Sequence, residues 1–147
     1  MKLGSLVTFN ALLFIGLGIA FAIYGPLMIA FFGAADLPGT ESLLYWYVAS
    51  FARMFGAALF GYGFLLLALR EMFKDGRPAA AGPQSALRRA LLFSLILGNA
   101  AGLLVALIQQ TGIWVTPAGW IWVGIFALLL LGYGFFLARS PETEPGG

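Results

Sequence analysis

The chain contains no cysteine and no histidine, and only 10% of its residues are charged. The first absence excludes disulfides, iron–sulfur clusters, thiolate or imidazole metal sites, and catalysis by either side chain. Soluble domains carry about 25% charged residues, so the charge content argues against one. The net charge is only +2, which gives nucleic acid no basis as a partner. We therefore expect no catalytic residue, no enzyme activity, no metal and no cofactor.

Hydrophobic residues make up 61% of the 147 residues and gather in four long runs. We predict membrane spans at about 4–24, 43–69, 86–110 and 117–138. At 1.5 Å per residue the first span is about 31 Å long, which matches the roughly 30 Å hydrocarbon core of a bilayer. The sequence predicts an all-α integral membrane four-helix bundle, with residues 1–147 in one domain and the lipid bilayer as its first partner.

Turn-forming residues separate the spans. Gly25-Pro26 is expected to kink or end the first helix, so residues 27–32 form either a short interfacial segment or the continuation of a kinked helix. Thr40 or Ser42 can cap the second span. Residues 70–85 are expected to form a loop between spans two and three, and Thr116-Pro117 is expected to start span four.

Basic residues mark one side of the predicted bundle. Seven of the eight Lys and Arg residues fall there: Lys2, Arg70, Lys74, Arg77, Arg88, Arg89 and Arg139. The positive-inside rule then places both termini and the central loop in the cytoplasm. An outer aromatic belt is expected at the opposite ends of the spans, from Tyr45, Trp46, Tyr47, Trp114, Trp120 and Trp122.

Arg53 is the candidate functional residue, because it lies inside a span and every acidic residue lies in a loop or tail. Ala49, Ala57 and Gly61 share its helix row, so we expect it to face other helices. It lies about 10 Å below Trp46. Three interpretations stay open. Its guanidinium snorkels to a phospholipid, a loop carboxylate or backbone carbonyls; or it bonds to polar groups of the bundle such as Gln110; or it binds an anionic ligand or a carboxylate of another protein.

Small residues predict where the helices pack. Gly56 and Gly61 lie on span two, and span three carries Ser94, Gly98, Gly102 and Ala106 at every fourth position, a typical helix-association row. Asn99 lies at mid-membrane beside this row and is expected to bond across helices. Asn10 is expected to be hydrated near the inner end. The triplets Gly61-Tyr62-Gly63 and Gly132-Tyr133-Gly134 suggest two related helical hairpins.

The pattern Arg53-x-x-Gly56-Ala57 in span two, with Gly25-Pro26 after span one and Asn99 in span three, resembles uncharacterised small bacterial four-span membrane proteins. The resemblance implies architecture and no activity. Our leading hypothesis is a non-catalytic accessory or structural subunit of a larger membrane complex, with an energy-transducing (photosynthetic or respiratory) complex as host by analogy. The alternative is a membrane protein that binds or transports a lipid or small anion at Arg53.

Overall fold

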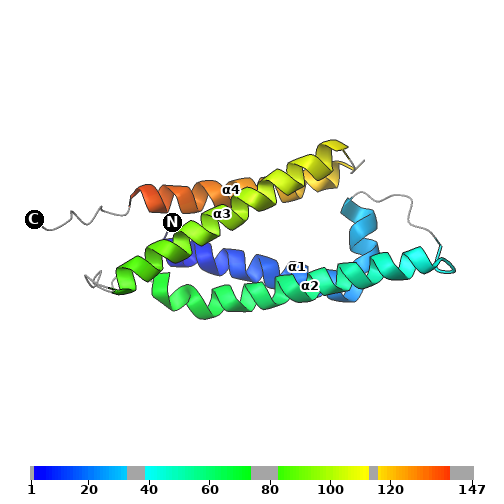
Figure 1. Ribbon diagram of the computed structural model, residues 1–147, viewed down its shortest axis with the longest axis horizontal. Helices are drawn as coiled ribbons and strands as arrows, with labels where there is room; N and C mark the ends of the chain where they lie inside the picture. Colours follow the sequence, from blue (N-terminus) through cyan, green and yellow to red (C-terminus); the bar gives the residue numbers. More distant parts are fainter. Residues whose placement is uncertain (1, 33–38, 74–82, 113–115, 140–147) are drawn as a thin grey trace, which may run out of the picture.

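The computed structural model describes residues 2–32, 39–73, 83–112 and 116–139. These residues form four helices, α1 (Leu3–Phe32), α2 (Leu43–Leu69), α3 (Pro83–Gly112) and α4 (Trp120–Ala138), as Figure 1 shows. A 3₁₀ turn, η1 (Arg70–Phe73), follows α2, and another, η2 (Pro117–Gly119), precedes α4. All four helices are long and apolar enough to cross a membrane, and no strand occurs in the described ranges. The predicted multi-pass, all-α membrane bundle is confirmed.

The helices pack as two hairpins, α1 with α2 and α3 with α4. The start of α1, the end of α2, the start of α3 and the end of α4 lie at the same end of the molecule (Figure 1). We call this the basic end, because Lys2, Arg70, Arg88, Arg89 and Arg139 all lie there. Contacts between the hairpins come mainly from α1 against α4, so α1 is the central helix of the fold.

The α1–α2 hairpin is held by small residues, which are spaced seven apart on α1 and lie at positions 52, 56 and 63 of α2. Both helices therefore present a narrow small-residue seam, as in left-handed helix pairs whose contacts repeat every seven residues. The seam pairs Gly63 with Ala11, Gly56 with Gly18, and Ala52 with Gly25. A Cβ placed on Gly56 would lie 2.7 Å from the Gly18 carbonyl oxygen, and one on Gly63 would lie 2.8 Å from the Ala11 carbonyl oxygen. The two backbones are thus in direct contact, which is how membrane helices associate without a hydrophobic driving force.

α1 bends near its second end, which lies opposite the basic end. Tyr24 has non-helical angles (φ −112°, ψ 33°), two residues before Pro26. Proline cannot donate to the carbonyl four residues earlier, and its ring crowds that turn. Residues 27–32 therefore remain helical but turn away from the first part of α1 (Figure 1). Phe32, at the end of this segment, is buried, so the segment is a continuation of span one that returns to the core.

An aromatic cluster joins the two hairpins at the end opposite the basic end. The Trp122 ring lies 5.5 Å from Phe32, 5.8 Å from Phe126 and 6.2 Å from Phe21, measured between ring centroids. Nearby, the Thr116 hydroxyl donates a 3.2 Å hydrogen bond to the Phe31 carbonyl. Rings at these distances stabilise beyond the area that they bury, so α4 is anchored to the bent end of α1.

Two connections differ from the sequence-based expectation. Residues 70–73 are not simply part of a loop, because η1 turns Phe73 into the core, where it is fully buried. Thr116 adopts an extended conformation before η2 but makes no side-chain capping bond, because its hydroxyl donates to the Phe31 carbonyl instead. Ser42 does cap α2, since its hydroxyl oxygen accepts from the Leu44 amide at 3.3 Å.

Candidate functional site

Arg53 lies on α2 and is exposed. Its Cγ is 3.7 Å from the point that a Cβ on Gly25 would occupy, so the aliphatic stem runs beside the bend of α1. Within the described part of the chain, its guanidinium makes no hydrogen bond and no ion pair. The structure therefore does not pair Arg53 with Glu41 or Gln110; Asp36 lies outside the described residues.

Arg53 belongs to a face of α2 that no other helix of this chain covers. At about 100° per residue, Ser50, Arg53, Ala57, Gly61 and Ala68 fall on one side of the helix, and all five are exposed. The exposed Phe64 lies on the same side, between Gly61 and Ala68 along the helix. We call these residues the open face of α2. A Cβ on Gly61 would meet nothing within 4 Å. The row was expected to face helices of this chain, but α1 takes the seam at Ala52, Gly56 and Gly63 instead, because those residues allow the closer backbone approach.

The predicted packing residues of α3 also fall into two groups, one in contact with another helix and one exposed. A Cβ on Gly102 would lie 2.5 Å from the Phe126 ring, so Gly102 makes room for α4. Gly98 is exposed and has open space where a Cβ would lie. The row at every fourth residue therefore does not form one continuous contact in this chain.

Asn99 lies at the middle of the apolar part of α3 and is only 3% exposed. Its Nδ2 donates to the Leu95 carbonyl of its own helix at 2.7 Å, and its Oδ1 has no partner. Asn99 thus does not make the expected interhelical bond. It lines a cleft of about 540 Å³ between α2 and α3, whose floor includes Phe14 of α1 and Phe126 of α4. We call this space the α2–α3 cleft.

A buried polar pair at the basic end was missed from the sequence. Asn10 of α1 donates through Nδ2 to the Tyr133 hydroxyl of α4 at 2.8 Å, and both side chains are fully buried. The expectation that Asn10 is hydrated was wrong, since α4 covers it. A signal was present, because Asn10 and Tyr133 lie about 10 Å and 8 Å from the basic ends of their helices and so at similar depth.

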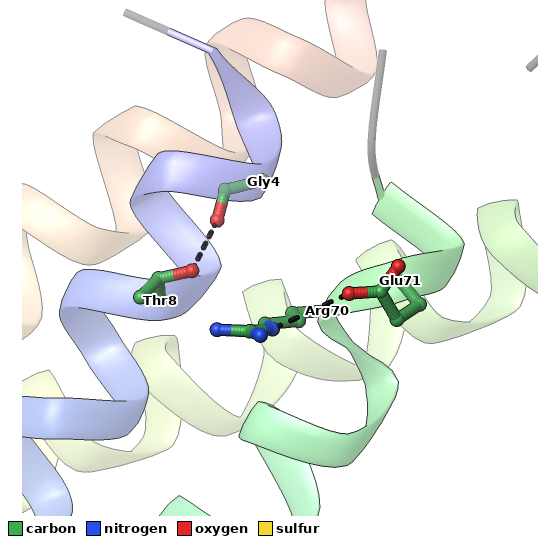
Figure 2. Close-up of polar contacts among 4 residues, drawn as sticks. All are labelled: Gly4, Thr8, Arg70 and Glu71. Carbon is green, nitrogen blue, oxygen red and sulfur yellow. Dashed lines mark hydrogen bonds and ion pairs between the residues drawn. The ribbon is translucent and has the colours of Figure 1, made fainter. Parts of the chain in front are cut away.

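A groove of about 760 Å³ also opens at the basic end. Lys2 and Arg70 line it, together with Ser5 and Thr8 of α1. Figure 2 shows that Arg70 extends from the end of α2 toward α1, with Thr8 bonded to the Gly4 carbonyl at 2.8 Å and Glu71 3.5 Å from the Arg70 Nε. Glu71 offsets part of the positive charge. Positive-inside flanking alone accounts for these two cations.

The aromatic residues of the expected belt fall into two groups. Trp46, Tyr47 and Trp120 are exposed, and the Trp46 indole donates to the Thr40 carbonyl at 2.9 Å. Tyr45 is half-buried and packs edge-on against Trp46 at 5.3 Å between centroids. Trp122 differs from the expected belt because it is only 5% exposed and lies in the aromatic cluster. Trp114 lies outside the described residues.

Comparison of the chain with protein-family models, with curated proteins and with solved structures finds no match. The resemblance noted from the sequence therefore stays a prediction, and function has to be argued from the arrangement of side chains. Among the described residues, no three Cys, His, Asp or Glu side chains gather as a metal site would require. The polar groups that stand out are the exposed Arg53 and the buried, unpartnered amide oxygens of Asn10, Asn99 and Gln110.

Proposed function

We propose that the chain is a non-catalytic accessory subunit that binds a transmembrane helix of a larger membrane complex through the open face of α2. The observation that carries this proposal is the position of Arg53, exposed and unpaired among the described residues, on a face that carries four small residues beside Phe64. Small residues mark helix interfaces in membranes, and an arginine at this depth costs roughly 2.5–3.5 kcal/mol when it lacks a partner.

The partner helix has a defined chemistry. It carries an Asp or Glu at the depth of Arg53, so that the two charges neutralise each other, and it packs closely over Ala57 and Gly61. Both residues are exposed and leave the backbone of α2 accessible to a second helix. Arginine suits this pairing because its planar guanidinium binds a carboxylate through two parallel hydrogen bonds.

The proposed setting is a bacterial inner membrane with both termini in the cytoplasm. The described Lys and Arg residues other than Arg53 all lie at the basic end, which supports this orientation. An energy-transducing complex is the proposed host class by analogy, because such complexes contain small helical subunits without cofactors.

A photo-crosslinking experiment tests the partner. A photoreactive amino acid is placed at Ala57 on the open face, and at Leu131 of α4 as a control that is 74% exposed. We expect Ala57, and not Leu131, to crosslink to one transmembrane helix that carries an Asp or Glu. A reciprocal charge exchange, Arg53→Glu with Arg introduced at that carboxylate, should restore an association that Arg53→Glu alone abolishes.

Native mass spectrometry of the gently purified protein provides the second test. Wild type should carry a stoichiometric partner, which Arg53→Met and Gly61→Leu lose and Gly98→Leu keeps. Gly98 is a matched control because it is also an exposed glycine with open space around it. A chain that runs alone near 15.7 kDa, without a partner, would overturn the proposal.

The second candidate function is a phospholipid-binding protein, with Arg53 on a headgroup phosphate. The exposure of Arg53 about 10 Å below Trp46 favours it, since the side chain can extend toward the headgroup layer. In the same experiment, a bound phospholipid that Arg53→Met loses and Gly61→Leu retains would support this candidate and contradict helix docking.

A further inference from the structure

We propose that the groove at the basic end binds one anionic phospholipid, with its phosphate held by Lys2 and Arg70 and an acyl chain along Phe9 and Leu12. The site is separate from the open face of α2, because Arg70 follows the end of α2, about 25 Å along the helix axis from Arg53. The proposal therefore goes beyond the accessory-subunit role and does not depend on it.

The positive charge of the groove comes from two segments that are distant in the sequence. Lys2 immediately precedes α1, and Arg70 follows α2 and extends toward α1 (Figure 2). Both side chains line the groove. The positive-inside rule explains why cations lie at this end, but it does not require two of them, from different helices, to line a single groove. Basic pockets of this kind between membrane helices bind anionic lipid headgroups.

The lining of the groove leaves both cations able to bind an anion. Among residues 2–32, 39–73, 83–112 and 116–139, the Lys2 ammonium has no ionic partner. The Arg70 guanidinium pairs with Glu71 through Nε at 3.5 Å, but Glu71 does not line the groove. In Figure 2 the guanidinium reaches toward Thr8 of α1 and away from Glu71. Its planar fork of donors suits a phosphate, and the exposed Ser5 hydroxyl adds a further donor.

The lining changes from polar to apolar with depth, in the same order as the parts of a phospholipid. Lys2, Ser5 and Thr8 lie nearest the basic end, on one face of the helix at spacings of three residues. Phe9 and Leu12 follow on that face and are 50% and 58% exposed. Lys2 and Leu12 are about 15 Å apart along α1, which is half of the roughly 30 Å hydrocarbon core. The groove therefore spans the depth of one leaflet.

Charge, lining and size together define the ligand class. A zwitterionic phospholipid would bring its own cation beside Lys2 and Arg70, so the electrostatic attraction would be weaker. A soluble anion would make no use of the apolar contacts at Phe9 and Leu12. The volume of about 760 Å³ falls within the range of about 300–1,000 Å³ that is typical of ligand sites. A transmembrane helix about 10 Å wide and 30 Å long would need roughly 2,400 Å³.

The test compares two phospholipids with identical acyl chains: phosphatidylglycerol, which has a net negative charge, and phosphatidylcholine, which is zwitterionic. Each is titrated into the purified protein in a non-ionic detergent, and native mass spectrometry measures the fraction with one bound lipid. One cation beside an anionic headgroup strengthens binding by about fivefold. We therefore expect the wild type to bind phosphatidylglycerol about 25-fold more tightly than phosphatidylcholine, if the two cations contribute independently. Inorganic phosphate, compared with chloride at equal ionic strength, should not displace the lipid.

Charge variants separate the groove from the basic end in general. Lys2→Gln and Arg70→Gln should each weaken phosphatidylglycerol binding by about fivefold and leave phosphatidylcholine binding unchanged, whereas Arg70→Lys should keep most of the preference. Arg88→Gln is the matched control, because it removes one positive charge from the same end but does not line the groove. It should bind both lipids as the wild type does. Arg53→Met should do the same, which distinguishes this site from a phospholipid at Arg53.

Three outcomes would overturn the proposal. Equal binding of the two lipids by the wild type would show that the groove does not select charge. An equal loss in Arg88→Gln and Arg70→Gln would show a diffuse basic surface in place of a site. Displacement of the lipid by inorganic phosphate would show a site for a soluble anion. Size-exclusion profiles and helical content of each variant confirm that it is folded.

Discussion

The Gly56→Ala substitution tests the central packing of the fold. A Cβ at residue 56 would lie 2.7 Å from the Gly18 carbonyl oxygen and closer still to the Ala22 backbone nitrogen. Ordinary contact begins at 3.4 Å, so the α1 and α2 backbones have to separate by at least 0.7 Å. Neither neighbour is a flexible side chain, so the strain cannot be relieved by a rotamer change.

The expected loss of stability in Gly56→Ala is worked out by comparison with Gly61→Ala on the same helix. Alanine raises helix propensity by about 1 kcal/mol over glycine in both variants, so this contribution cancels in the difference. Overpacking typically costs about 1–3 kcal/mol. We therefore expect Gly56→Ala to be about 1–3 kcal/mol less stable than Gly61→Ala, whose added methyl group meets open space. For a soluble chain of this length, that difference lowers Tm by about 2–12 °C.

The assay is thermal unfolding in a mild detergent, followed by circular dichroism and by size-exclusion chromatography of heated samples. Tryptophan emission gives an independent reading, because Trp122 is buried in the aromatic cluster and should become exposed. Gly61→Ala should unfold at or slightly above the wild-type temperature. Equal unfolding temperatures for the two variants would refute the close backbone contact between α1 and α2.

Three further predictions use the same assay. Tyr133→Phe removes the hydrogen-bond partner of the buried Asn10 amide and should lower the free energy of unfolding by about 1–3 kcal/mol. Adding Asn10→Leu should recover most of that loss, and no recovery would contradict the pairing. Trp122→Ala should cost about 3–5 kcal/mol, as large aromatic deletions in cores do, whereas the exposed Trp120→Ala serves as a near-neutral control. Gly102→Ala should lower the free energy of unfolding by under about 1 kcal/mol, because the added methyl group meets only the Phe126 ring, which can shift. A loss of stability as large as that of Gly56→Ala would show a rigid α3–α4 contact.

The four spans could be predicted because a bilayer needs long apolar segments, and the sequence contains four of them. Which small residues make contacts could not be predicted from a repeat of four. The α1–α2 hairpin instead uses a repeat of seven through Ala11, Gly18 and Gly25. The crossing geometry decides which spacing is used, and a sequence with glycine at many positions supports more than one.

Asn10 and Trp122 show a second limit of sequence reasoning. Each was assigned to a wet or interfacial position from its distance along one helix, and both are buried. Depth along a helix does not specify the direction in which a side chain points. Asn10 is covered by α4, and Trp122 by the bent end of α1, so both depend on contacts between hairpins.

The circumference of α2 is divided into three faces, and this division allows helix docking to be tested without disturbing the α1–α2 contact. One face is the seam against α1, and its glycines cannot be enlarged without moving backbone. The second lines the α2–α3 cleft, and the third is the open face with Arg53. Gly61 and Gly98 are exposed glycines with open space, one on the open face and one in the cleft. Leucine at Gly61 should therefore abolish binding of the partner helix, whereas leucine at Gly98 should leave it unchanged, and loss of the partner by both variants would contradict docking on the open face.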